Sequence, residues 1–329
     1  MIRAANHSFY PRVGENPLDQ QLRTVLRKRS RGKASDADVA AVADEVAGIA
    51  VAEQSRAFID VVTDGLIRWD GLLSHVAAHL EGVEVGGLER WFDTNFYDRR
   101  PEIVGPIGRP EAFLVRDYEC AMATALTPVK MVLPGPVTFA RLSKDRHYGD
   151  VAAAARAVAE ALALEVRDLS AAGAKIFQLD EPLLCAHPDD AELVAETGGQ
   201  VFAGAGENAV TILSTYFGDL AGVADLDVLP GTHLGLDMVG GPANFDLLAR
   251  LPEGKNVALG LFDARTTRLE DAADVAELLA PHREHLVVRD VMVGPQTGLE
   301  YLPRDQAFDK LQQARYLVEK LSKEWTWVS

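Results

Sequence analysis

The sequence predicts an α/β fold, namely a (β/α)8 TIM barrel that forms a single domain over residues 1–329. Short β-like runs alternate with long helical stretches along the whole chain, which is the pattern of parallel strands joined by crossover helices. No Gly-x-Gly-x-x-Gly motif follows the first strand, as a doubly wound dinucleotide-binding sheet would require. No repeat and no Pro-, Ser- or Gly-rich linker divides the chain, so one domain is expected.

The predicted strands are short runs of apolar and β-branched residues. They are Arg3–Phe9, Phe58–Thr63, Pro128–Leu133, Lys175–Leu179, Ala209–Ser214, Thr232–Met238, Asn256–Phe262 and Leu286–Val293. A weaker strand is expected at Trp91–Asn95. The number of strands fits a barrel better than an open sheet.

The predicted helices are rich in Ala, Leu and Glu, with apolar residues three and four apart. They are Asp36–Arg56, Tyr148–Ala172, Pro242–Leu251, Leu269–Leu279 and Arg304–Glu324. Ser35 is a suitable N-cap for the first helix, and Gly173 a suitable C-cap residue for the second. The irregular, aromatic and arginine-rich segment Leu66–Arg116 is interpreted as an elaborated loop region over the barrel mouth.

Composition and charge exclude several classes of protein. The chain is 48% apolar, with 33 basic and 49 acidic residues and a formal net charge of −16, which argues against a nucleic-acid partner. No apolar run is long enough for a membrane helix, and no signal peptide is expected, so we predict a cytoplasmic protein without a membrane partner. Cys120 and Cys185 are interpreted as two reduced, mostly buried thiols.

Polar residues follow the predicted strands at the end where a barrel builds its site. Most are carboxylates, and the set comprises Asp64, Asp93, Asn95, Asp180, Glu181, Asp237 and Asp263. Any one of them could instead be a helix N-cap or a turn residue. Together they predict a cationic group between them, either a ligand amine or a metal, unless their pKa values are raised. Gly135 is expected to leave backbone exposed for a ligand to approach.

Histidine and cysteine do not predict a zinc site. Neither Cys falls at a strand end together with a His, as structural or catalytic zinc would require. His233 and Asp237 lie four residues apart on one predicted strand, but a structural histidine is favoured over a metal ligand at His233. A Ser–His nucleophile is not expected either, because no Gly-x-Ser-x-Gly motif occurs.

Seven motifs in order give the chain a resemblance to the cobalamin-independent methionine synthase family over nearly its whole length. They are Pro11–Gly14, Arg90–Asn95, Leu133–Phe139, Gln178–Pro182, Ser214–Gly218, His233–Asp237 and Gly260–Arg265. The chain resembles the amino-terminal barrel of that two-barrel enzyme more closely than its catalytic carboxy-terminal barrel. The resemblance implies a methyltransferase of methionine biosynthesis, in which a zinc-bound homocysteine thiolate attacks the methyl group of a methylated folate.

The chain departs from the family at its metal and folate residues. Ser214, Thr215 and Tyr216 stand where the catalytic barrel carries a His-x-Cys pair, Thr297 stands at its last Cys, and Asp237 aligns with its acidic ligand. The resemblance therefore makes zinc doubtful. A run that grips the folate polyglutamate tail in the family is replaced by Pro17–Gln20, although the second tail contact, Asn95, is kept.

The resemblance also assigns residue roles. Asp180 occupies the position that holds the amino group of homocysteine, and Asp180 and Asp237 are the catalytic candidates. The substrate-binding candidates are Asp93, Asn95, Gly135, Asp180, Glu181, Tyr216 and Asp263.

Three functions stay open on the sequence. The first is methyl transfer to homocysteine or a related thiol, with methylated folate as one possible donor. The second is a non-catalytic module that binds folate or a partner, such as a separate catalytic-barrel protein. The third is a carboxylate-metal enzyme of another reaction class.

Overall fold

The structure is a computed structural model, and it describes residues 1–92, 94 and 96–328. The chain divides into two compact units, each assembled from separate stretches of sequence. Unit 1 comprises Met1–Arg68, Asp117–Lys130 and Leu259–Ser329, and unit 2 comprises Trp69–Arg116 and Met131–Ala258.

The strands of unit 1 are parallel neighbours. Their order is β1 (Ile2–Ala4), β10 (Val291–Pro295) and β9 (Asn256–Phe262), the last of which begins in unit 2. Ile2 lies opposite Val291, so strands β1 and β10 begin at the same level of the sheet. Every residue of β10 is buried, as expected for a parallel strand covered on both faces.

The predicted strand Phe58–Thr63 is present only as two pairing residues. Val61 forms a parallel bridge with Ala5, and Val62 forms one with Val129. The segment cannot be extended from its start, because Phe58 has a φ of +59°, in the left-handed region. The short β1 and these two bridges together continue the parallel arrangement toward Lys130, the first residue of β4 (Lys130–Pro134).

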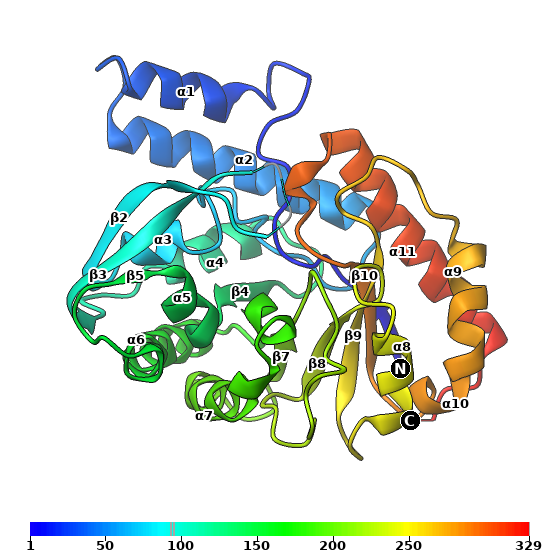
Figure 1. Cartoon of the computed structure of the whole chain (residues 1–329). Coiled ribbons are helices and arrows are strands. Elements are labelled where there is room, and N and C mark those ends of the chain that lie inside the picture. Colours follow the sequence, from blue (N-terminus) through cyan, green and yellow to red (C-terminus); the bar gives the residue numbers. More distant parts are fainter. Residues whose placement is uncertain (93, 95, 329) are drawn as a thin grey trace. The chain divides into compact units, whose positions relative to one another are not determined.

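The helices of unit 1 include three that the sequence predicted, at α2, α9 and α11. They are α1 (Gln21–Arg29), α2 (Asp36–Arg56), α4 (Val115–Met122, whose first two residues belong to unit 2), α9 (Ala272–Leu279), α10 (Arg283–Leu286) and α11 (Arg304–Glu324), with short 3-10 turns at Ala280–His282 and Leu299–Tyr301. Helix α11 packs on β1 and β10, and α9 lies beside it (Figure 1).

Helix α2 begins and ends where the sequence predicts. The side chain of Ser35 accepts a hydrogen bond from the backbone N–H of Asp38, and the Asp38 carboxylate accepts one from the Ser35 N–H. This reciprocal capping box satisfies two backbone donors that the first turn of a helix leaves open. The predicted N-cap is therefore confirmed.

Unit 2 holds a second set of parallel strands and the helices that follow them. The strand order is β8 (His233–Asp237), β7 (Val210–Ser214), β6 (Ile176–Asp180) and β4 (Lys130–Pro134, whose first residue belongs to unit 1). The helices are α3 (Ser74–Ala77), α5 (Pro136–Leu142), α6 (Val151–Ala171), α7 (Ala191–Phe202) and α8 (Asn244–Leu247), with 3-10 turns at Pro182–Cys185, Pro188–Asp190 and Leu248–Arg250.

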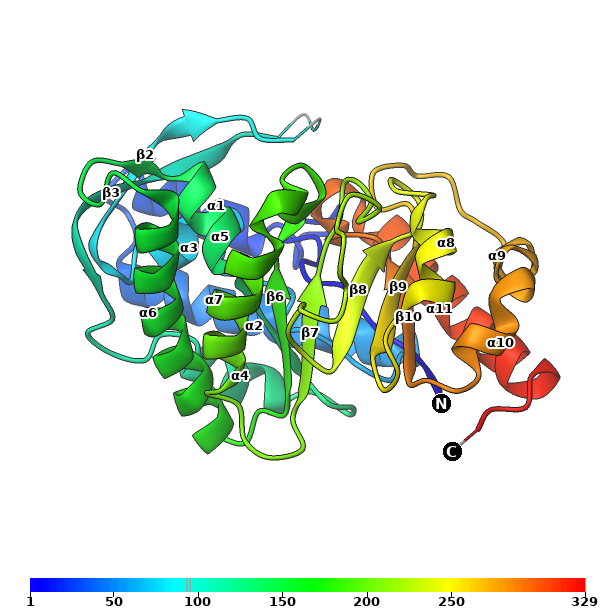
Figure 2. The same cartoon turned by 60° about the horizontal axis from the view of Figure 1, so that its bottom comes forward.

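Strands β6 and β7 run in register from end to end, with Ile176 opposite Val210 and Asp180 opposite Ser214. Their carboxyl ends therefore lie at the same edge of the sheet. Helices α6 and α7 pack side by side (Figure 2). Gly173, with a φ of +105°, follows the end of α6 as the predicted C-cap glycine.

The segment interpreted as an elaborated loop contains regular structure. It holds α3 and two long antiparallel strands, β2 (Glu81–Glu89) and β3 (Asp98–Gly108). Strand β3 also pairs in parallel with β5 (Lys144–Asp145), which follows α5. The weak strand expected at Trp91–Asn95 is wrong for its described residues, because Trp91, Phe92 and Thr94 form the turn region between β2 and β3.

Most other predicted elements are present with small shifts of their ends, but the strand expected at Arg3–Phe9 ends at Ala4, and the one expected at Leu286–Val293 begins only at Val291 because Leu286 ends a helix. The helix expected at Pro242–Leu251 is shorter, since it is divided into α8 and a 3-10 turn. Among the described residues, no helix combines the length and apolar character needed to cross a membrane. Parallel strands that alternate with helices confirm the α/β class in each unit.

Candidate active site

Asp180 is the last residue of β6 and is a buried carboxylate, with 1% of its surface exposed. Gln178, two residues earlier on the same face of the strand, donates from Nε2 to Oδ1 of Asp180 at 2.7 Å. The Tyr216 hydroxyl donates to Oδ2 at 3.3 Å. Both oxygens are thus held in place at the carboxyl end of a parallel strand, where barrels build their sites.

Tyr216 belongs to an aromatic group formed by two parts of unit 2. Its ring contacts Phe217 edge-on with ring centres 5.0 Å apart, and Phe92 lies 5.0 Å from Phe217 and 6.5 Å from Tyr216. Phe92 comes from the turn between β2 and β3. The hairpin therefore reaches the carboxyl end of β7, next to the residue that hydrogen-bonds Asp180.

Both phenylalanines have left-handed backbone conformations, with φ of +58° at Phe92 and +64° at Phe217. Such conformations are unfavourable for bulky residues and are retained where the surrounding structure fixes them. At Phe217 the fixing contact is a hydrogen bond from its N–H to Oδ2 of Asp237 at 2.9 Å. This bond sets the course of the chain just after Tyr216.

Asp237, at the end of β8, is bound to backbone on both oxygens. Besides Phe217, the N–H groups of Val239 and Gly240 donate to its Oδ1, at 2.9 and 2.6 Å. A carboxylate that accepts three backbone hydrogen bonds anchors the loops after β7 and β8. The geometry makes Asp237 a positioning residue for Tyr216, and its catalytic role stays a prediction.

Glu181 follows Asp180 and points to the start of α5. Its two oxygens accept hydrogen bonds from the N–H groups of Val137 at 2.9 Å and Thr138 at 2.8 Å. Burial raises the pKa of Glu181 to about 7, although these hydrogen bonds lower it. Glu181 therefore caps a helix N-terminus, the structural alternative that the sequence left open for such residues.

Gly135 does not leave backbone open for a ligand, and that prediction is wrong. The residue is buried, and a side chain at this position would collide with the Glu181 carboxylate. A glycine is required at this position because the Glu181 side chain passes it to reach the first N–H groups of α5. The N–H of Gly135 donates to the carbonyl of Asp180 at 2.8 Å, which ties the ends of β4 and β6 together.

In unit 1, two predicted carboxylates also bond to nearby backbone. Asp263 accepts hydrogen bonds on Oδ1 from Gln296 Nε2 at 3.1 Å and from the N–H of Arg265 at 2.9 Å. Asp64 accepts one from the N–H of Leu66 at 3.2 Å, and burial raises its pKa. Both lie after their strands, as predicted, and a role of Asp263 in substrate binding stays a prediction.

Two candidates, Asp93 and Asn95, lie outside the described residues. His233 begins β8 and Asp237 ends it, so they are roughly 13 Å apart at the usual rise of a strand. His233 is buried, with Nδ1 2.9 Å from the Thr232 hydroxyl. This separation contradicts a metal site shared by His233 and Asp237 and agrees with the structural histidine that the sequence favoured.

The described part of the chain contains no group of three or more His, Cys, Asp or Glu side chains arranged to hold a metal ion. Cys185, in the turn after β6, is half-buried, and burial raises its pKa to about 12, with a hydrogen bond to Thr215 opposing the shift. Its sulfur is therefore a thiol at neutral pH and a poor ligand or nucleophile.

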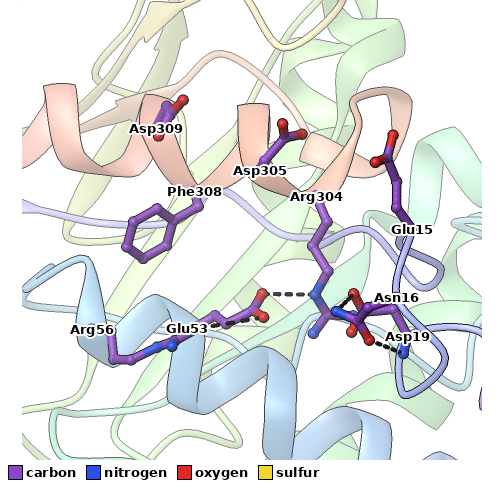
Figure 3. Close-up of a pocket in the computed structure, with 9 residues that line it drawn as sticks. All are labelled: Glu15, Asn16, Asp19, Glu53, Arg56, Arg304, Asp305, Phe308 and Asp309. Carbon is purple, nitrogen blue, oxygen red and sulfur yellow. Dashed lines mark hydrogen bonds and ion pairs between the residues drawn. The ribbon is translucent and has the colours of Figure 1, made fainter.

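A separate cavity of about 430 Å³ lies in unit 1 between α2 and the start of α11. Figure 3 shows Arg304 between Glu53 and Asp19, with Nε 2.7 Å from Oε2 of Glu53 and Nη1 3.7 Å from Oδ1 of Asp19. Arg304 is 6% exposed. These contacts tie α11 to α2 and to the loop after β1, so we regard Arg304 as structural.

Gln178 and the aromatic pair Phe92 and Phe217 are site residues that were not predicted from the sequence. Gln178 could have been found from its spacing, since residues two apart on a strand share a face. No signal in the sequence indicates that Phe92 meets Phe217, because 124 positions separate them in the chain. That contact depends on how the hairpin folds.

Comparison with known proteins shows a family match. Residues 11–193 match the family described as "Cobalamin-independent synthase, Catalytic domain". Proteins named methionine synthase are similar over most of the chain. The one from Sulfurisphaera tokodaii is 28% identical over 302 residues, covering 91% of this chain and 88% of the relative. The one from Saccharolobus solfataricus is 26% identical over 306 residues, covering 91% and 90%.

Solved structures share the fold. A B12-independent methionine synthase from Shewanella sp. W3-18-1, in complex with selenomethionine, has a TM-score of 0.84 at 20% identity and covers 98% of each chain. A putative vitamin-B12 independent methionine synthase from Listeria monocytogenes has a TM-score of 0.76 at 16% identity, covering 98% of this chain and 99% of that one. The predicted TIM-barrel class is confirmed. The matching family description concerns the catalytic domain, and a closer relation to the amino-terminal barrel stays a prediction.

Proposed function

Because the chain belongs to the cobalamin-independent methionine synthase family, we propose that it binds an amino acid bearing a thiol or thioether and transfers a methyl group to homocysteine or a related thiol. The observation that carries this proposal is the buried carboxylate of Asp180, held by Gln178 and Tyr216 at the carboxyl end of β6.

A buried carboxylate suits the ammonium group of an amino acid. A charge-assisted hydrogen bond in a site closed to water is stronger than one in solvent. Asp180 is already oriented by two neighbours, so it loses little freedom when it binds. The selenomethionine complex of the Shewanella neighbour supports an amino acid as the ligand of this fold.

Atoms and electrons balance in the proposed transfer. The thiol loses its proton, a lone pair of the sulfur forms a new S–C bond to the methyl group, and the bond between methyl and donor breaks with its electron pair remaining on the donor, which takes up the proton. Asp180 and Tyr216 contribute to this step by fixing the amino acid and hence the direction of its sulfur.

Zinc does not fit the residues at the family's metal positions. The Thr215 hydroxyl donates to the carbonyl of Gly235 at 2.9 Å, the Tyr216 hydroxyl donates to Asp180, and both oxygens of Asp237 accept backbone N–H groups. These positions supply no thiolate or imidazole, which a tetrahedral zinc site of this kind requires. We derive no catalytic step from zinc.

This donor set favours a second candidate function. A barrel that binds the amino acid or a folate without transferring methyl would need Asp180 but no thiol-activating group. A separate catalytic-barrel protein could then act on the same substrate. The chain covers 88–90% of the methionine synthases from S. tokodaii and S. solfataricus, so its length is close to theirs.

Methylated folate is the donor that we propose to test first, in its monoglutamyl form. Asp19, in the run that replaces the tail-binding residues, is buried against Arg304 and accepts a hydrogen bond from the Asn16 side chain at 2.5 Å. The run Pro17–Gln20 contains no cation that could hold a polyglutamate tail. The cytoplasmic location stays a prediction.

Two measurements test the proposal. Isothermal titration with L-homocysteine and L-methionine should show binding that Asp180→Asn weakens about tenfold or more, because an amide loses the charge-assisted contact. Asp189→Asn changes the charge equally at an exposed site and should leave the dissociation constant unchanged.

Methyl transfer from monoglutamyl and triglutamyl methylfolate is then measured on the same protein, together with its metal content. Transfer without stoichiometric zinc supports the enzyme. Binding without transfer supports the accessory module. Equal affinity of the wild type and Asp180→Asn for both amino acids would overturn the assignment of Asp180, and stoichiometric zinc would overturn our account of the metal positions.

A further inference from the structure

Helix α1 and the turn after it carry the densest positive charge of an acidic protein. Six cations and no acid lie between residues 23 and 33, and removing their six charges from the net −16 leaves −22 for the rest of the chain. We call this set the basic cluster, and it consists of Arg23, Arg27, Lys28, Arg29, Arg31 and Lys33.

The basic cluster is exposed and little neutralised by the protein itself. All six residues are exposed to solvent. Arg29 forms an ion pair with Asp36 at 2.7 Å. Hydrogen bonds with Ser35 lower the pKa of Asp38, and the nearby charge of Lys28 adds to this effect. Within the described part of the chain, the other four form no ion pair or side-chain hydrogen bond.

Local helix stability does not account for the whole basic cluster. Cations in the last turn of α1 interact favourably with the carbonyl end of the helix. Arg23 lies earlier, four residues before Arg27, and like charges at that spacing repel each other. Arg31 and Lys33 lie beyond the helix end. The cluster thus carries a local electrostatic cost that a bound anion would remove.

A groove of about 540 Å³ runs between α1 and the first half of α2, which lie side by side in Figure 1. Apolar groups of Pro17, Val25, Ala41 and Val42 line it, together with the cations Lys28 and Lys33 and one carboxylate, Asp38, which accepts a hydrogen bond from the Ser35 N–H. The groove can therefore take an apolar side chain beside two cations.

We propose that α1, the basic cluster and this groove form a docking surface for an acidic segment of a partner protein, with an apolar side chain of the segment in the groove and its carboxylates on the cations. The cluster extends beyond the groove, since Arg23, Arg27 and Arg31 do not line it, and this extent exceeds what a small anion would occupy.

The charge pattern favours an acidic protein over nucleic acid. A nucleic acid tracks a continuous basic surface and stacks its bases on aromatic rings. Residues 17–42 contain no aromatic residue, and the rest of the chain is strongly acidic. An acidic protein segment needs only the local cluster and gains from the apolar groove.

The test uses the full chain and a fluorescein-labelled amphipathic peptide of Glu and Leu, with binding followed by fluorescence anisotropy. We expect binding that weakens as salt rises, because exposed charge pairs are screened. Replacing Arg23, Arg27 and Arg31 by Gln should weaken it about tenfold, the sum of three exposed ion pairs. Ala41→Gln should also weaken it by filling the groove.

The matched control replaces Arg167, Arg250 and Lys323 by Gln, which removes the same charge from exposed positions elsewhere. It should bind the peptide as the wild type does, and circular dichroism should show that all variants are folded. Equal peptide affinity of the two triple variants would overturn the proposal. Tighter binding of duplex DNA, RNA or anionic vesicles at the same salt, or salt-dependent self-association through the cluster, would overturn the choice of an acidic partner.

Discussion

Glu181 makes the stability of the protein depend on pH. Burial raises its pKa from the ordinary value of 4.5 to about 7, so the folded protein holds this proton where the unfolded chain has released it. The free energy of unfolding should therefore be highest below about pH 4.5 with respect to this group and should fall as pH rises to about 7. The loss is roughly 3 kcal/mol for a shift of this size.

Urea unfolding of the wild type and of Glu181→Gln at several pH values measures this contribution. The amide cannot ionise. The difference in unfolding free energy between the two proteins should therefore change between about pH 4.5 and about pH 7 and be constant above that range. Glu160→Gln on the exposed face of α6 should keep the wild-type slope. A slope in Glu181→Gln equal to that of the wild type would show that another group titrates.

The sequence predicted where the strand-end carboxylates lie, but not what their oxygens contact. Asp180, Glu181 and Asp237 all stand at the ends of their predicted strands. The spacing on the strand could have placed Gln178 beside Asp180, but only the folded chain shows that Tyr216 donates to Asp180, whereas Glu181 and Asp237 face backbone N–H groups. A strand pattern fixes the position of a residue, and the path of the following loop decides its partner.

At the scale of the element, the N-terminus of α2 depends on the Ser35 hydroxyl. Ser35→Ala should lower the free energy of unfolding by about 1 kcal/mol, since one backbone N–H in the first turn loses its acceptor. Ser35→Gly should lower the free energy of unfolding by only a few tenths of a kcal/mol, because glycine exposes the same N–H to water. Chemical denaturation checks both, and equal losses in the two variants would contradict the capping role.

Elements with strong local signals were predicted best. Helices α2 and α11 have the predicted bounds, because an N-cap or a proline precedes a long amphipathic repeat. The β2–β3 hairpin was missed because few of its residues are buried and Gly82, Gly86 and Gly87 interrupt the alternation of side chains. In the folded chain β3 also contacts β5 and α6, and local sequence patterns carry no information on such contacts.

At the scale of the molecule, the chain order of the two units argues for cooperative folding. Unit 1 is built from three separate segments and unit 2 from two. Neither is continuous in sequence, and β4 and β9 each pass from one unit to the other. An independent domain normally folds from a continuous stretch with its own core. We therefore expect the chain to unfold as one cooperative domain, as the sequence predicted.

The tryptophans report on the units separately, since Trp69 and Trp91 belong to unit 2 and Trp325 and Trp327 to unit 1. A variant with phenylalanine at the first pair reports unit 1 by fluorescence, and one with phenylalanine at the second pair reports unit 2. In each variant we expect the fluorescence midpoint in urea to coincide with that of far-ultraviolet circular dichroism, as two-state unfolding requires. Two separate midpoints would mean that the units unfold independently, because one unit can stay folded after the other has unfolded only if its own core is sufficient to hold it.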